Sequence, residues 1–142
     1  MKLNELERPY ISDHDFFEKM MVVVFGSGIK KTVVEKKWEC IQSHFTDFWK
    51  VAEYDEQKLL EIYNDPNMLR NPHKINAIVY NANHMIEIFS VYGSMDEFIR
   101  SYELANFEYS EWIMANDLMS RFKYFGEVTS LRFIESVFGM SC

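Results

Sequence analysis

Hydrophobic residues recur at intervals of three and four through most of the chain, which is the period of a helix with one buried face. The clearest stretch runs from residue 72 to residue 92. Asn71 is suited to cap its start, Pro72 to occupy its first position, and Gly93 to end it. We therefore predict one long helix over 72–92. Its apolar face consists of Ile75, Ile78, Val79, Ala82, Ile86 and Phe89.

Similar patterns predict further helices on both sides of this one. Ser12 or Asp13 can cap a first helix, and Asp55 can open a short third helix that stops before Pro66. A weak break is expected near 105–106. The expected helices cover about 14–26, 30–45, 55–65, 95–104 and 108–121, with a last one from about 129.

Composition sets the fold class and the number of domains. The chain has 142 residues, of which 48% are hydrophobic and 16% aromatic, enough to bury a core. It contains only 5 Gly and 3 Pro, and no alternating apolar runs bounded by tight turns. We expect an all-α fold of about seven helices in a single domain over 1–142.

Several classes of protein and site are disfavoured by pattern. The longest apolar run, Met20–Phe25, is far short of the ~20 residues that span a bilayer, and the start lacks a secretory arrangement. Cys40 and Cys142 form neither a disulfide framework nor a Cys-x-x-Cys site. No catalytic or nucleotide-binding motif of the common types occurs. We expect a cytoplasmic protein with free thiols, no membrane association and no cofactor.

Charge bears on the choice of partner. The net charge of −7 opposes binding to nucleic acid, because phosphate contacts need Lys and Arg. The acids nevertheless concentrate at 13–18, 53–61 and 96–111, and the basic residues are grouped elsewhere. Either a basic face on an acidic body or ordinary solvated helix surfaces would produce this grouping. The basic groups are Lys30, Lys31, Lys36 and Lys37; Arg70, His73 and Lys74; and Arg121, Lys123 and Arg132.

One basic group stands at the start of the 72–92 helix. Arg70 and Lys74 lie where free backbone N–H groups and the positive end of the helix dipole favour an anion such as a phosphate. A solvated basic turn is the alternative.

Residues 116–139 predict a helix, a tight turn and a second helix. Lys123 lies in the turn, and Gly126 lets its backbone approach a partner closely. Thr129 can cap the last helix, whose N–H groups then point at the same spot. This hairpin is a phosphate site in principle, although Glu127 places an acid at the turn.

Two segments carry a family resemblance. The first matches D-x-G-I-I-R-x-x-x-K-I-x-A-I-x-x-N-A through Asp65, Met68, Leu69, Arg70, Lys74, Ile75, Ala77, Ile78, Asn81 and Ala82. The second matches F-K-F-V-G-x-T-x-x-x-x-F through Phe122, Lys123, Tyr124, Phe125, Gly126 and Phe133. These patterns resemble the 3-methyladenine DNA glycosylase I family of the helix-hairpin-helix glycosylase superfamily. The resemblance keeps the family's order and extends from about Pro9 to Met140.

The resemblance implies a helix-hairpin-helix glycosylase fold in two lobes. Their cleft takes a damaged base extruded from duplex DNA, while the hairpin grips the phosphates of one strand. Extrusion costs roughly a few kcal/mol and needs aromatic stacking and a wedge. We place the wedge at Phe25, for which a core-facing helix end is the alternative reading. The expected DNA-binding residues are Arg70, Lys74, Lys123, Gly126, Thr129 and Phe25.

The active-site positions depart from the family. On the alignment that the resemblance gives, the family's catalytic acid falls on Val23, which cannot ionise, and a tryptophan of its base pocket falls on Lys31. Glu18 and Asp15 lie about one turn from Val23. They are either a displaced general base or ordinary surface carboxylates at the start of a helix. The catalytic residue therefore stays unassigned.

The family's zinc staple is also not expected here. Its N-terminal Cys and His would precede residue 1, and its C-terminal His and Cys would follow Met140. His14 and Cys142 are too few ligands for tetrahedral zinc. We expect no metal.

Three functions stay open at this point. The chain is a divergent DNA glycosylase that hydrolyses the N-glycosidic bond of an alkylated purine, a catalytically silent module that binds damaged duplex DNA, or a protein-interaction module on the same fold. A positive face containing Arg70, Lys74, Lys123 and Thr129 would favour DNA. An exposed apolar patch without such a face would favour a protein partner.

Overall fold

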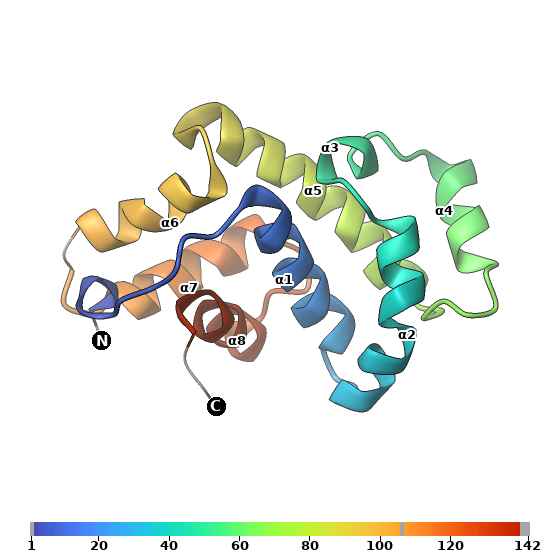
Figure 1. Ribbon diagram of the computed structural model, residues 1–142, viewed down its shortest axis with the longest axis horizontal. Helices are drawn as coiled ribbons and strands as arrows, with labels where there is room; N and C mark the ends of the chain where they lie inside the picture. Colours follow the sequence, from blue (N-terminus) through green and yellow to red (C-terminus); the bar gives the residue numbers. More distant parts are fainter. Residues whose placement is uncertain (1, 106, 140–142) are drawn as a thin grey trace.

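Helices make up all the regular secondary structure of residues 2–105 and 107–139, the part of the chain that the computed structural model describes. Eight are α-helices and one is a 3₁₀ helix in that part of the chain. They are η1 (Leu3–Glu5), α1 (Asp13–Gly26), α2 (Lys31–His44), α3 (Phe48–Val51), α4 (Glu56–Tyr63), α5 (Pro72–Tyr92), α6 (Met95–Leu104), α7 (Ser110–Arg121) and α8 (Glu127–Phe138). The predicted all-α class is confirmed (Figure 1).

Local capping explains why the long central helix begins and ends where predicted. The Asn71 side chain accepts a hydrogen bond from the Lys74 backbone N–H, and Pro72 occupies the first turn. Gly93 ends α5 in the left-handed region at φ 83°, a conformation that glycine adopts without steric cost. Both predicted ends of the 72–92 helix are confirmed, as are those of the 95–104 helix.

The structure differs from the sequence prediction at one helix start and adds one short helix. Thr129 does not cap the last helix, because α8 begins at Glu127 with Gly126 in the capping position. The short helix α3 was not predicted, and it begins after Asp47, whose carboxylate accepts from the Trp49 N–H. Asn106, in the expected break, and the terminal residues 140–142 lie outside the described residues.

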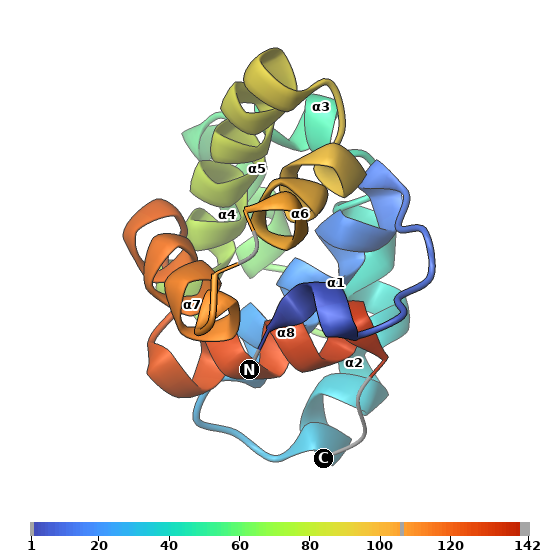
Figure 2. The same cartoon turned by 90° about the vertical axis from the view of Figure 1, so that its left-hand side faces the viewer.

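The helices are arranged around α1 and α5. At one end of the molecule α6, α7 and α8 pack together (Figure 1). At the other end lie α2, α3 and α4, of which α3 and α4 contact α5. Helix α3 packs on the second half of α5, where the Trp49 ring meets that of Phe89. Helix α1 contacts α2, α5, α6 and α8, and so joins the two ends. Figure 2 shows α6 and the upper part of α5 above the pair formed by α7 and α8. No helix of the described residues is long and apolar enough to cross a membrane.

An aromatic cluster fixes α1 against the end that carries the hairpin. Phe16 is fully buried, and its ring lies 4.9 Å from that of Phe133, 6.2 Å from that of Phe122 and 6.4 Å from that of Phe98, measured between centroids. These contacts join α1 to α8, to the hairpin turn and to α6. Each such ring contributes roughly 1.5–3 kcal/mol by burial alone.

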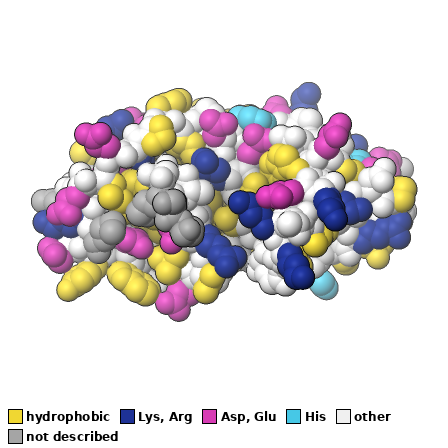
Figure 3. All heavy atoms as spheres, turned by 60° about the horizontal axis from the view of Figure 1, so that its bottom comes forward, with side chains coloured by type: hydrophobic (Ala, Val, Ile, Leu, Met, Phe, Trp, Pro, Cys, Tyr) yellow, Lys and Arg dark blue, Asp and Glu magenta, His cyan; other side chains and the backbone are white. Residues whose placement is uncertain are grey.

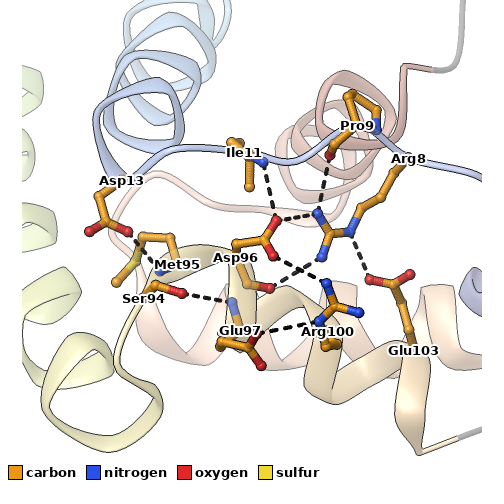
Figure 4. A network of polar contacts seen from close by, with 10 residues as sticks. All are labelled: Arg8, Pro9, Ile11, Asp13, Ser94, Met95, Asp96, Glu97, Arg100 and Glu103. Carbon is orange, nitrogen blue, oxygen red and sulfur yellow. Dashed lines mark hydrogen bonds and ion pairs between the residues drawn. The ribbon is translucent and has the colours of Figure 1, made fainter.

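A polar network holds the segment before α1 against the start of α6 (Figure 4). The Arg8 guanidinium donates to Asp96 at 2.5 Å and to Glu103 at 2.7 Å, and the Ile11 N–H donates to Asp96 at 3.1 Å. Asp13 accepts from the Met95 N–H at 2.8 Å. Burial works to raise the pKa of Asp96, but the hydrogen bonds from Arg8 and Ile11 outweigh it and hold the pKa below its usual 3.8.

Candidate functional site

The turn between α7 and α8 is fixed to the middle of α5. Asn81 is fully buried on α5, and its side chain makes two hydrogen bonds to the Lys123 backbone, accepting from the N–H at 2.8 Å and donating to the carbonyl at 3.1 Å. Phe122 and Phe125 bury the two ends of the turn. One amide side chain and two buried rings therefore help to hold the hairpin turn in place.

The outer side of the turn presents a cation and a helix start. The Lys123 ammonium lies 4.3 Å from the centroid of the Tyr80 ring, so its side chain extends along α5. Tyr124 has a φ of 63°, which is unusual for a residue with a side chain and marks a tight local turn. At Gly126, a side-chain β-carbon would meet no atom within 4 Å, and no side chain caps the first N–H groups of α8. These N–H groups are positioned to bind an anion.

An apolar hollow of about 750 Å³ lies between α1, α2 and the middle and later part of α8. Two smaller hollows, of about 420 and 490 Å³, continue it in opposite directions along the same face. Arg132 lines the large hollow and the smaller one that also contains Thr129. The large hollow is lined by Val22, Val23, Gly26, Ile29, Lys31, Val34, Glu35, Trp38, Arg132 and Ser136.

Lysine and arginine gather on the face that carries these hollows. Figure 3 shows this side, where Lys and Arg side chains gather at the centre and right, with a few acids among them. Lys30 and Arg132 line the 490 Å³ hollow, Lys31 lines the large one, and all three are exposed. Lys123 is also exposed, in the turn beside the Tyr80 ring. The predicted basic face on an acidic body is consistent with this arrangement.

Carboxylates border the hollow rather than projecting into an enclosed site. Glu18 lies at the 420 Å³ end, where it accepts from the Gln42 side chain at 2.7 Å and lies 3.5 Å from the His14 ring nitrogen. Glu35 pairs with Lys31 at 3.9 Å, and both are well exposed. Val23 is part of the wall, at the position where the resemblance assigns the catalytic acid.

Trp38 was missed as a site residue, because its helical spacing was read only as a core face. It lies seven residues after Lys31, which is two turns of helix, and both residues line the large hollow. The resemblance had assigned a pocket tryptophan to Lys31. The same-face spacing was the available signal that a tryptophan stands nearby on this helix.

The sequence predicted that Lys74 presents its charge to a phosphate in solvent, and this prediction is wrong. Its side chain is only 5% exposed, and its ammonium donates to the carbonyls of Phe25 at 3.0 Å and Ser27 at 2.6 Å. Burial lowers the pKa of Lys74. The residue caps the end of α1, and since Ser27 lines the 490 Å³ hollow, Lys74 supports that wall from behind.

Phe25 is also placed differently from the prediction. Its side chain is fully buried, and its ring lies 6.2 Å from that of Phe45. A wedge must reach a duplex from the surface, so this position does not fit that role, and the alternative reading of a core-facing helix end describes it. Arg70 is exposed at the start of α5, with its guanidinium 5.9 Å from the Tyr63 ring centroid.

The second observation that the sequence left open, an exposed apolar patch, is found away from the hollow. Several large hydrophobic side chains around the connection between α6 and α7 are 40–74% exposed. They are Leu104, Phe107, Tyr109, Trp112 and Ile113. None of these side chains lines one of the three hollows. Of the positive face expected at Arg70, Lys74, Lys123 and Thr129, Lys74 is buried.

The fold is that of the 3-methyladenine DNA glycosylases. The structure of 3-methyladenine DNA glycosylase I from Staphylococcus aureus, solved to explain its recognition of 3-methyladenine, superposes with a TM-score of 0.78 at 23% identity, covering 92% of this chain and 78% of that one. A crystal structure of 3-methyladenine DNA glycosylase I gives 0.77 at 20% identity, over 93% of this chain and 82% of that one. A solution structure of such an enzyme gives 0.78 at 20%, over 94% and 81%.

The sequence itself shows the family. The family model for methyladenine glycosylase matches residues 4–140. The chain belongs to the methyladenine glycosylase family.

Proposed function

We propose that this protein takes an alkylated purine, extruded from duplex DNA, into the hollow between α1, α2 and α8 and hydrolyses its N-glycosidic bond. The observation that carries this proposal is the continuity of two surfaces. Arg132 borders both the apolar hollow and the hollow beside Thr129 at the start of α8. A strand bound by its phosphates at the hairpin would thus have an apolar receptacle directly beside it.

The large hollow suits an extruded base more than a charged or polar metabolite. Val22, Val23 and Val34 offer apolar contact, and Trp38 offers an aromatic surface for stacking. Extruding a base costs roughly a few kcal/mol, and stacking on an aromatic side chain returns about 1–3 kcal/mol per base. An alkylated purine that is already cationic is extruded and cleaved more readily than an intact one.

A cationic purine is already a good leaving group, so the protein does not have to protonate it. The bond between C1′ and the ring nitrogen breaks, and its electron pair neutralises the positive purine, which leaves without being protonated. A water oxygen then bonds to C1′, and the proton lost from that water goes to a carboxylate or to solvent. Glu18 is the carboxylate we assign to this step, because Gln42 holds it at the border of the hollow.

Two features favour the alternative functions. Val23 in the wall of the hollow favours a DNA reader that binds the extruded base without hydrolysis. The exposed side chains around Phe107 and Trp112 favour an interaction with another protein, in place of DNA or in addition to it.

Filling the hollow tests where the base is received. Ser136 lines the large hollow, and its hydroxyl donates to the Phe133 carbonyl; Ser120 on α7 is exposed and makes the same kind of bond to the Asp117 carbonyl. Ser136→Trp should weaken binding to DNA that carries a 3-methyladenine at least tenfold relative to Ser120→Trp, because the new side chain occupies the space proposed for the base. Equal affinity of the two variants would contradict the assignment of the hollow.

A further inference from the structure

Three side chains that offer metal-ligating atoms converge at the far end of α2. Cys40 and His44 are four residues apart on the last turns of this helix, and therefore lie on one face. Asp65 follows the end of α4. The three candidate ligand atoms all lie within 4.8 Å of one another, and within the described residues this is the group of three that could hold a metal ion.

The contacts converge on one carboxylate oxygen. His44 Nε2 lies 2.7 Å from Asp65 Oδ2, and the Cys40 thiol donates to the same oxygen at 3.4 Å. In a nucleophilic cysteine site the thiol would instead face the imidazole, with the carboxylate behind the ring. The carboxylate lies between the thiol and the imidazole, and the proton of each group can bridge to it. A single metal cation at the same place could bind all three groups instead.

We propose that Cys40, His44 and Asp65 bind a divalent transition metal of the zinc class. The proposal is independent of the function assigned to the hollow. Sulfur, nitrogen and oxygen ligands in one set suit zinc or a similar ion, whereas magnesium and calcium prefer oxygen alone. On binding, the thiol gives up its proton to solvent, the imidazole coordinates through Nε2 with its proton on Nδ1, and water completes a tetrahedron.

The three ligand atoms already lie within 4.8 Å of one another, so accepting an ion requires a local adjustment of side chains. Ligand atoms at about 2.0–2.3 Å from zinc stand roughly 3.3–3.6 Å apart in a tetrahedron, so the contact between His44 and Asp65 must open by about 0.6 Å while that between Cys40 and Asp65 barely changes. The Asn67 N–H holds the other Asp65 oxygen at 2.9 Å, and Tyr54 donates to the His44 carbonyl at 2.6 Å. The set is thus already oriented by its surroundings.

No metal was expected from the sequence, where His14 and Cys142 were too few ligands. Spacing does not connect His44 with Asp65 either, because they stand 21 residues apart along the chain. Only the packing of α4 against the rest of the fold brings the third ligand into reach. An ion there would join the end of α2 to the loop that leads towards Arg70 and α5. Its expected effect is structural, since it would bind the folded chain and not the unfolded one.

Cobalt(II) is the direct probe, applied to full-length protein freed of metal with a chelator. One equivalent should bind with a dissociation constant below about 10 µM, and should give a thiolate-to-cobalt charge-transfer band that zinc then abolishes. Cys40→Ser and Asp65→Asn should lose the band, and Cys142→Ser, the matched thiol control, should keep it. A band retained in Cys40→Ser, or no band at millimolar cobalt, would overturn the proposal.

A second test uses the wild-type protein and therefore does not depend on any variant folding. It measures whether zinc protects Cys40 from alkylation. Stoichiometric zinc should slow iodoacetamide labelling of the Cys40 peptide at least tenfold, measured by mass spectrometry, with the Cys142 peptide as the internal reference. Equal labelling of Cys40 with and without zinc would also overturn the proposal.

Discussion

The buried side-chain amide of Asn81 on α5 makes two hydrogen bonds to the backbone of Lys123 in the hairpin turn. Both the carbonyl and the N–H of Lys123 are satisfied by this single side chain. The long central helix thereby determines where the start of α8 lies relative to the hollow. The geometry of the proposed DNA site rests on this link between two distant parts of the sequence.

Removing this amide should loosen the hairpin. Asn81→Ala leaves two polar backbone groups of Lys123 without their partner and should lower the free energy of unfolding by about 1–3 kcal/mol. Asn76→Ala is the control, because Asn76 is exposed on the same helix and donates to the Pro72 carbonyl of that helix, and it should cost under about 0.5 kcal/mol. Urea denaturation measures both. An equal effect of the two substitutions would show that the link is unimportant.

Substitutions at Lys74 and at Arg70 should have different effects, the first on stability and the second on DNA affinity. Lys74→Met leaves two carbonyls at the end of α1 without a donor, and should lower the free energy of unfolding by about 1–3 kcal/mol. Arg70→Ala should leave stability within about 0.5 kcal/mol but weaken DNA binding and reduce the salt slope by about 1. Fluorescence anisotropy at several salt concentrations measures the second effect. An unchanged salt slope for Arg70→Ala would remove Arg70 from the interface.

Acid should release the segment that precedes α1. The pKa of Asp96 is lower in the folded protein than its usual 3.8, so the folded state binds fewer protons and its stabilisation is complete above that value. This stabilisation is lost as the pH falls below about 3.8 towards the folded pKa. The difference in unfolding free energy between the wild type and Asp96→Asn should be about 3 kcal/mol at pH 7, because the ion pair with Arg8 is buried, and should shrink in acid.

The neighbouring glutamate serves as the control for this pH dependence. Glu97 is exposed beside Asp96 on α6, and Glu97→Gln should change stability by under about 0.5 kcal/mol at pH 7. Denaturant titrations at pH 7, 5, 4 and 3 give the comparison. If the Asp96→Asn difference stays constant down to pH 3, the ion pair with Arg8 is not the source of acid sensitivity.

Glu18 should matter for the chemical step and little for binding. Glu18→Gln keeps a side chain of the same size beside Gln42 and should slow release of the alkylated base at least tenfold, with binding to the abasic analogue within about twofold. Glu39→Gln on α2 is the control, since Glu39 is exposed and lines none of the hollows. Release at the wild-type rate by Glu18→Gln would exclude this carboxylate.

The helices of this fold were largely predictable because their ends are fixed by neighbouring residues. Asn71, Pro72 and Gly93 act within a few residues of the helix that they bound, so the sequence contains the whole argument. At Thr129 the same reasoning was wrong. The helix continues two residues further back, to Glu127, because glycine takes the capping position without any side-chain hydrogen bond.

The site was less predictable because it depends on how helices meet. Nothing near Lys74 in the sequence indicates that its ammonium reaches the end of α1. Its partner there, Ser27, stands 47 residues away along the chain. Phe25 is buried for the same kind of reason, since Phe45 of a different helix end covers it. The hollow needs α1, α2 and α8 together, although the spacing of Lys31 and Trp38 already placed both on one face.

The most direct test of the proposed function is single-turnover release of 3-methyladenine from methylated duplex DNA, with protein in large excess over DNA. The account predicts release of the free base by the wild type at a rate that saturates with protein concentration, and at least tenfold slower release by Ser136→Trp than by Ser120→Trp. Tight binding of the abasic analogue with no release of 3-methyladenine would contradict hydrolysis and leave a DNA reader. If the protein neither bound nor released, the hollow would not be a base pocket.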